Sequence, residues 1–252
     1  MPKNHRNHMK YKKNHTIKSI FFDLDHTLVD CATADKRTYE ILATIARKQL
    51  DTINTPNLIH DFRQLLIKQP FDPDGRIDVH TWRIDLWTQA LSKQNIDHED
   101  LARQLNHAFH FERLAFYVLD HSVQTLLNDL LKTYTGIIIT NGDTTIQRPK
   151  LAACNAHHYF GQNIIVGGEE PHEKPHASIF EKACDMADCS PQEAIMVGDR
   201  LHTDIQGGIN AGLAATVWVN PNNDPLDHDG PEPHFQVISV LELPAILSGL
   251  HK

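Results

Sequence analysis

The chain has 252 residues and a formal net charge of -8 at pH 7, with 24 lysines and arginines against 32 aspartates and glutamates. This balance argues against a general nucleic-acid or membrane-surface binder, because such proteins need a basic face, and it favours a small ligand as the partner. No apolar run approaches the about 20 residues that cross a bilayer, and the polar N-terminus lacks the apolar core of a signal peptide, so we expect a cytoplasmic protein.

Residues 1–17 are rich in Lys, Arg, Asn and His and contain few apolar side chains. They cannot bury enough surface to offset the entropy of ordering, so we predict a flexible polar tail. A transition-metal site formed by His5, His8 and His15 is the alternative. It requires convergent geometry that a flexible segment does not supply.

The run from Lys18 to Phe22 is short, apolar and β-favouring, and Asp23 and Asp25 follow it. Side chains at positions i and i+2 of a strand share a face, so these two carboxylates should lie close together. At an effective dielectric near 20, two carboxylates about 4 Å apart repel by roughly 4 kcal/mol. The pair therefore requires a cation, a shared proton or a chain reversal that separates it. A solvated loop in which Asp25 caps the next helix is the simpler alternative, and we favour a metal site.

Residues 31–120 show helical periods without convincing strands. One apolar stripe has the spacing i, i+4, i+7, i+8, and a second follows a plausible helix start at Asp97-x-x-Asp100. A turn at Phe71 to Gly75 separates the first stripe from the next helical stretch. The segment therefore predicts an all-helical insertion. The first stripe consists of Leu58, Phe62, Leu65 and Leu66.

Within this insertion, Asp78 to Gln94 is expected to be a helix with Arg83 and Trp87 on one face, because they are four residues apart. An arginine beside an aromatic ring can hold an anionic or sugar part of a substrate. Core packing of Trp87, with Arg83 as a solvated neighbour, is the interpretation we favour. Arg83 is therefore only a candidate substrate contact.

From His121 onward, strands and helices alternate. The expected strands are short, β-branched and continuously apolar, which predicts a parallel sheet with helices on both faces. The strands are expected at Lys18–Phe22, Gly136–Thr140, Asn163–Val166, Ala194–Val197 and Ala215–Val219, with a last short strand and helix within Val237–Leu247.

Polar groups follow several of these strands. Ligands on open parallel sheets bind outside the carboxyl ends of the strands, so we expect these groups to share one edge with Asp23. The groups are Thr140-Asn141-Gly142-Asp143, Lys174-Pro175 before a helical stretch, Gly198-Asp199, and Asp204.

The order D-x-D-x-T, T-N-G, K-P and G-D-x-x-x-x-D, from Asp23 to Asp204, resembles the haloacid dehalogenase (HAD) superfamily, whose members mostly hydrolyse phosphate monoesters. The resemblance implies an α/β fold, with a Rossmann-like parallel sheet core and an all-helical, C1-type cap. The core is then formed by residues 18–30 and 121–252, and the cap by residues 31–120. A mobile cap excludes water during phosphoryl transfer and still admits substrate.

The resemblance also implies roles for the site residues. Asp23 is the expected nucleophile, which forms an aspartyl phosphate, and Asp25 the general acid and base. The presence of Asp25 makes a carbon–halogen substrate unexpected. Phosphate is expected to bind Thr140, the backbone amides of Asn141 and Gly142, and Lys174. Hard oxygen ligands favour Mg²⁺, which we place on Asp23, the backbone carbonyl of Asp25, and Asp199, with Asp204 reaching it directly or through water.

Within the superfamily, the second half of the chain most resembles N-acylneuraminate-9-phosphatases, through Val166-Gly167-Gly168-Glu169 and the run from Val197 to Gly212. N-acylneuraminate 9-phosphate is therefore the first expected substrate. A nucleoside 5'-monophosphate or a flavin-precursor phosphate is the alternative, because the same half also resembles phosphatases of those compounds. A phosphomutase shares the core residues, and a non-catalytic phospho-accepting module remains a further alternative.

Overall fold

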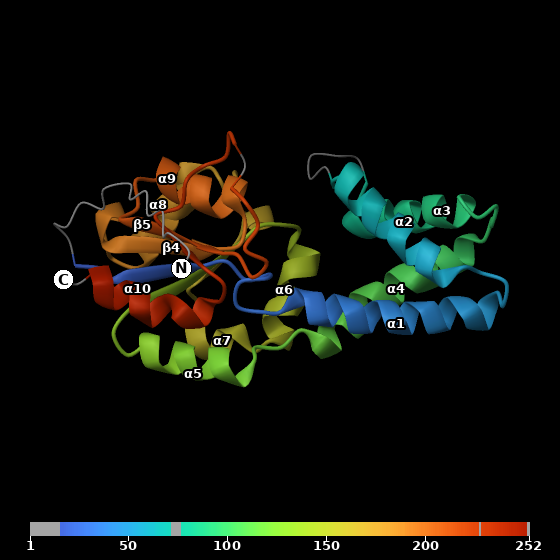
Figure 1. Ribbon diagram of the computed structural model, residues 1–252, viewed down its shortest axis with the longest axis horizontal. Coiled ribbons are helices and arrows are strands. Elements are labelled where there is room, and N and C mark those ends of the chain that lie inside the picture. The colour runs from blue at the N-terminus through green and yellow to red at the C-terminus, as the bar shows by residue number, and fades with distance from the viewer. Residues whose placement is uncertain (1–15, 72–76, 227, 251–252) are drawn as a thin grey trace, which may run out of the picture. The chain divides into compact units, whose positions relative to one another are not determined.

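The computed structural model describes residues 16–71, 77–226 and 228–250 (Figure 1). Almost all of the predicted tail, with its three histidines, and most of the predicted turn after Phe71 lie outside the described residues. The chain divides into two compact units: Cys31–Val118, and Leu119–Lys252 together with the segment up to Asp30. In the part that is described, no helix is long and apolar enough to cross a membrane.

The larger unit contains the predicted parallel sheet. Among the described residues it has six strands in the order β3-β2-β1-β4-β5-β6, and every neighbouring pair is parallel. The predicted α/β class is confirmed. The strands are β1 (Ser19–Phe22), β2 (Thr135–Thr140), β3 (Ile164–Val166), β4 (Ala194–Gly198), β5 (Ala215–Val219) and β6 (Phe235–Val237).

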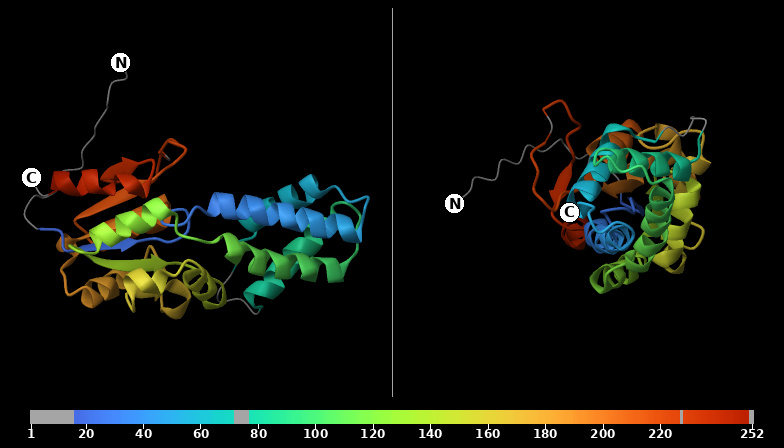
Figure 2. Two further views of the ribbon diagram at one scale, coloured as in Figure 1. Left: turned by 90° about the horizontal axis from the view of Figure 1, so that it is seen from below. Right: turned by 90° about the vertical axis from the view of Figure 1, so that its right-hand side faces the viewer.

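Both faces of this sheet are covered by helices (Figures 1 and 2). On one face Phe21 belongs to a buried cluster with Phe180 of helix α8. On the other, the ring of Phe22 meets that of Phe160 in helix α7 edge to face, 6.0 Å between centroids. Alternate residues of β1 therefore anchor opposite layers, which explains the continuously apolar sequence. The helices are α5 (His121–Leu130), α6 (Thr144–Ala153), α7 (Ala156–Phe160), α8 (Ala177–Met186), α9 (Gln206–Asn210) and α10 (Leu243–Leu250).

Short helical turns join these elements. They are the 3-10 turns Gly167–Glu169, Pro191–Glu193 and Val240–Glu242, and the π-helical turn Leu201–Ile205 that leads into α9. The last strand, β6, ends at Val237, where we expected it to begin. A capping box on Ser239, closed by Glu242, follows this strand and starts the turn before α10.

The smaller unit is helical in its described part and has its own core. Phe62 of α2 and Trp87 of α3 stack with centroids 3.6 Å apart, and Phe109 of α4 meets Phe62 edge to face. Three residues of the predicted stripe are buried: Leu58, Phe62 and Leu65. Trp87 is also buried, so it packs in the core of this unit. The helices are α1 (Cys31–Gln49), α2 (Thr55–Lys68), α3 (Val79–Ser92) and α4 (Glu99–Phe116).

Two boundaries differ from the expectation. Helix α4 begins at Glu99 and not at Asp97, because the ring of His98 accepts the amide of Leu101 at 3.1 Å and acts as the N-cap. The smaller unit ends at Val118 and not at residue 120, because Leu119 pairs with Val29 in an isolated antiparallel bridge of the larger unit.

Candidate active site

The carboxyl ends of β1, β2 and β4 converge on one pocket of about 260 Å³. Asp23 follows β1, Thr140 ends β2, and Asp199 follows β4. Strand β1 lies between the other two, so its parallel neighbours place their last residues beside Asp23. The pocket is lined by Asp23, Asp25, His26, Thr140, Asn141, Lys174, Asp199, Arg200 and Thr203.

Asp23 and Asp25 do not remain on one strand face. Strand β1 ends at Phe22, and the chain then reverses, because the amides of Leu28 and Val29 both donate to the carbonyl of Leu24 at 3.1 Å. His26 takes a positive φ of 59° in this reversal. Both carboxylates line the pocket, but each binds a different lysine, so chain reversal and separate counterions reduce the expected repulsion.

Lys174 is the centre of the first ion-pair network. Its Nζ donates to Asp23 Oδ1 and Asp204 Oδ1, both at 2.7 Å, and to the carbonyl of Ile139 at 2.6 Å. The side chain of Asn141 holds the Lys174 backbone from both sides, accepting its amide at 3.0 Å and donating to its carbonyl at 2.7 Å. Burial opposes the charged lysine, but the carboxylates of Asp204 and Asp23 outweigh it and raise the pKa of Lys174.

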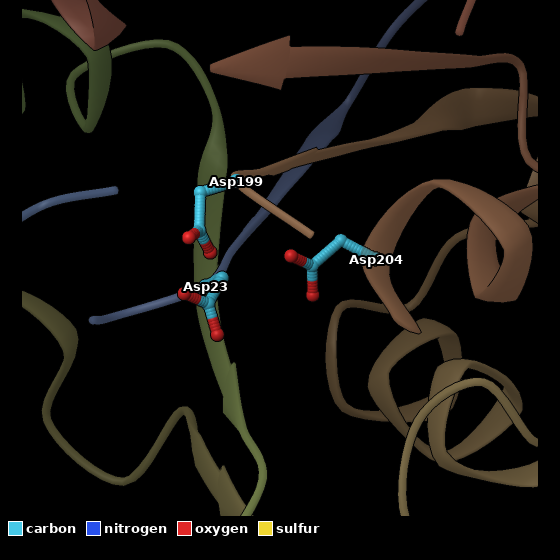
Figure 3. Close-up of side chains that lie close together, drawn as sticks. All are labelled: Asp23, Asp199 and Asp204. Carbon is cyan, nitrogen blue, oxygen red and sulfur yellow. The ribbon is translucent and has the colours of Figure 1, made fainter. Parts of the chain in front are cut away.

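Three carboxylates offer oxygen atoms within 4.8 Å of one another: Asp23, Asp199 and Asp204 (Figure 3). Burial raises the pKa of Asp23 to about 7, against the opposing effect of Lys174. Burial also raises the pKa of Asp199, together with repulsion from Asp23 and Asp204, to about 8. When all three carboxylates are ionised, they carry more negative charge than Lys174, the lysine that binds two of them, neutralises. Hard oxygen donors with excess negative charge fit a divalent cation such as Mg²⁺.

Asp204 is less available to such an ion than the other two carboxylates. It is fully buried, and its second oxygen accepts the backbone amide of Arg200 at 2.9 Å. Gly198 allows this close approach, because a Cβ there would lie 2.3 Å from Cγ of Asp204. Asp204 therefore holds Lys174 and the loop after β4 in place beside the pocket.

Two other predicted residues have contacts that the sequence did not indicate. The amide of Gly142 donates to the side chain of Glu173 at 3.1 Å, and Gly142 does not line the pocket. Arg83 lies in the smaller unit, where its guanidinium sits over the ring of Phe109, 5.5 Å from the centroid.

Sequence reasoning did not identify Lys150, Gln147 or Arg200. Lys150 donates to both oxygens of Asp25, at 2.9 and 2.7 Å, from helix α6. The signal for the first two was present, because Gln147 and Lys150 are polar residues on the buried face of α6 that Ile146 and Leu151 define. Arg200 lines the pocket beside Asp199.

The sheet order, the aspartates that follow β1 and β4, and the buried Lys174 that binds Asp23 agree with a hydrolase of the HAD class. The chain matches the haloacid dehalogenase-like hydrolase model over residues 17–212 and belongs to this family. It is 38% identical to N-acylneuraminate-9-phosphatase of Rattus norvegicus over 237 residues, or 93% of this chain and 95% of that protein. The chain is accordingly an enzyme, a phosphatase of this family.

The chain is also similar to a second phosphatase in sequence and to a solved structure in fold. The chain is 30% identical to a pyrimidine 5'-nucleotidase of Streptococcus pneumoniae over 241 residues, or 90% of this chain and 93% of that protein. Its fold is similar to that of the magnesium-bound HAD hydrolase YfnB from Bacillus subtilis, with a TM-score of 0.72, 20% identity, and coverage of 92% of this chain and 99% of that structure.

Proposed function

We propose that the chain is a Mg²⁺-dependent phosphatase that hydrolyses a small phosphorylated metabolite through an aspartyl phosphate on Asp23. The observation that carries this proposal is the position of Asp23. It follows the central strand, lines the pocket, and binds the buried Lys174 beside Asp199. A carboxylate held this way is oriented for attack on an incoming phosphorus atom. The nearby ammonium group of Lys174 offsets the negative charge of the carboxylate and of the phosphate.

In the first step an oxygen of Asp23 attacks phosphorus, the new P–O bond forms, and the bond to the substrate oxygen breaks. Asp25 gives a proton to the departing alkoxide. In the second step Asp25 takes a proton from water, whose oxygen attacks phosphorus and releases Asp23 and phosphate. Mg²⁺, held by Asp23, Asp199 and the carbonyl of Asp25, supplies positive charge against the phosphate oxygens when it is bound.

Phosphate binding is assigned to Thr140, the amides of Asn141 and Gly142, and Lys174. Thr140, Asn141 and Lys174 line the pocket. The Gly142 amide contributes only after it leaves the Glu173 carboxylate that it now binds. Glu173 therefore competes with substrate phosphate for this donor, and its release is part of phosphate binding.

N-acylneuraminate 9-phosphate is the first candidate substrate, because the relative of that name is 38% identical over 93% of this chain. A nucleoside 5'-monophosphate is the second, because of the 30% identity to the pyrimidine 5'-nucleotidase. We assign substrate selection to the helical unit Cys31–Val118 in the role of a cap. Arg83 is its candidate contact to an anionic or sugar part of the substrate.

The test is phosphate release from a panel of phosphomonoesters, including both candidates, flavin mononucleotide and simple sugar phosphates, with Mg²⁺ and with a chelator. We expect metal-dependent release concentrated on one compound. Asp23→Asn should abolish it, by at least about 10⁴-fold, and leave the fold intact. Normal turnover by Asp23→Asn would rule out the covalent route, and activity that requires a bisphosphate would indicate a phosphomutase.

A further inference from the structure

We propose that Lys150 is a positioning residue, assisted by Gln147, that orients the carboxyl group of Asp25 for its two proton transfers. The inference rests on the proposed function, in which Asp25 is the acid and base. Lys150 Nζ lies 2.9 and 2.7 Å from the two oxygens of Asp25, and the Gln147 amide lies 3.4 Å from Oδ2. Lys150 does not line the pocket, whereas Asp25 does, so Lys150 acts through Asp25.

Helix α6 places the side chains of Gln147 and Lys150 next to Asp25. It begins just after the loop Thr140 to Asp143, and the Asp143 side chain caps it by accepting the amide of Thr145 at 2.8 Å. Gln147 and Lys150 are three residues apart and so share a face. Gln147 also donates to the carbonyl of Asn141 at 2.7 Å, so one side chain connects the phosphate-binding loop to Asp25.

Burial and a carboxylate counterion hold the ammonium group of Lys150 in place. Only 6% of the residue is exposed, and a buried ammonium group is stable only with a counterion. Asp25 supplies that counterion, whereas Asp23 has its own in Lys174. The two carboxylates that follow β1 are thus held by two different lysines, and Lys174 has Asp204 as a second carboxylate partner.

The contact geometry explains how Lys150 serves the reaction. Both oxygens of Asp25 now face the ammonium group. To protonate the leaving oxygen, one oxygen of Asp25 must carry a hydrogen atom and face the substrate, while the other stays on Lys150. The remaining hydrogen bond holds that oxygen in place and restricts rotation of the carboxyl group, which keeps the working oxygen on the pocket side. In the second step the same oxygen receives the proton of the attacking water.

The experiment compares Lys150→Met with Asp25→Asn, the double variant, and Lys132→Met as a matched control. Lys132 also binds an aspartate, Asp129, at 2.8 Å, but on an exposed part of the larger unit. Each protein is assayed with the best alkyl phosphate of the panel at steady state and with 4-nitrophenyl phosphate in the pre-steady state. The aryl ester has a good leaving group and needs no acid in the first step.

We expect Lys150→Met to lower kcat for the alkyl ester about 100-fold, with KM changed less than about 3-fold, while the burst of 4-nitrophenolate persists. The kcat of the double variant should lie within about 3-fold of the kcat of Asp25→Asn alone, because both changes remove the same function. Lys132→Met should keep full activity. If the burst rate of Lys150→Met fell along with kcat, Lys150 would have only a structural role. The same would follow if the fold-loss of kcat in the double variant equalled the product of the two single losses.

If Lys150→Met fails to fold in a thermal unfolding assay, Gln147→Leu carries the same test. It should lower kcat for the alkyl ester about 10-fold and keep the burst, and no difference between the two esters would overturn the inference. Normal turnover by Asp25→Asn would contradict the proposed function itself. An inactive Asp25→Asn beside a fully active Lys150→Met would contradict only the role of Lys150.

Discussion

The contact between Gly198 and Asp204 gives a sharp test at the scale of one residue. A Cβ at position 198 would lie 2.3 Å from Cγ of Asp204, which is buried and bound to Lys174. Gly198→Ala must therefore displace the carboxylate, and we expect a loss of about 1–3 kcal/mol in the free energy of unfolding and about 100-fold in kcat. Gly249→Ala is the matched control, because nothing lies within 4 Å of its Cβ. Equal behaviour of the two variants in denaturant titrations and assays would contradict the packing argument.

The raised pKa values of Asp23 and Asp199 predict how Mg²⁺ binding depends on pH. They are about 7 and about 8 in the folded protein, against a usual value of 3.8. The metal-free fold holds protons that the unfolded chain has lost, so its stability falls as the pH rises from about 4 to about 8. Mg²⁺ must displace these protons at low pH and binds ionised carboxylates at high pH. Thermal unfolding should therefore show a larger rise in Tm on addition of Mg²⁺ at pH 8.5 than at pH 6, and an equal rise would contradict the assignment.

At the scale of elements, the stack between α2 and α3 dominates the core of the helical unit. Trp87 is fully buried against Phe62, and its indole N–H has no hydrogen-bond partner among the described residues. We expect Trp87→Ala to lower the free energy of unfolding by about 3–5 kcal/mol. Trp87→Phe should lower it by only about 1–2 kcal/mol, because it also removes an unsatisfied donor.

Denaturant titration measures both changes, and Trp82→Phe is a useful comparison. Trp82 is partly buried, and its N–H donates to the carbonyl of Gln69 at 3.1 Å. Its replacement therefore loses a satisfied hydrogen bond along with contact area. If Trp87→Phe were as harmful as Trp87→Ala, ring area alone would not explain the stability of this core.

At the scale of the whole molecule, the helical unit is an insertion in the sheet unit. Val29 and Leu119 pair directly, so the two chain ends that flank Cys31–Val118 are close together in the sheet unit itself. Replacement of Cys31–Val118 by a short Gly-Ser linker should leave a sheet unit that folds. This unit has a buried core and buried ion pairs within it, and a short loop between nearby chain ends has a small entropy cost of closure.

We expect this shortened protein to unfold cooperatively and to gain stability from Mg²⁺. It should hydrolyse 4-nitrophenyl phosphate slowly and discriminate little among the phosphomonoesters of the panel, because the proposed selectivity lies in the removed unit. Circular dichroism, thermal unfolding and relative kcat/KM values measure these properties. A shortened protein without a cooperative transition, or one with unchanged selectivity, would contradict this division of roles.

The sequence by itself determined the sheet and the position of the pocket. Strand β1 and the strands ending at Thr140 and Gly198 are short apolar runs, and the groups that follow them are local features of the chain. Parallel strands bring their carboxyl ends to one edge, so local pattern alone predicts that Asp23, Thr140 and Asp199 meet. Lys174 was also predicted from local context, through its proline and the helix after it.

Only the tertiary structure decided which charges pair within that pocket. Lys150 and Asp25 are 125 residues apart, and their contact depends on the rotation and depth of α6 against the end of β1. The hydrogen bond from the Gly142 amide to Glu173 is likewise set by a loop that returns 31 residues later. Such pairings follow from side-chain packing between separate elements, which no periodicity along the chain encodes. The sequence therefore determined at which edge of the sheet the site residues meet, and side-chain packing in the folded protein determined which lysine binds which carboxylate.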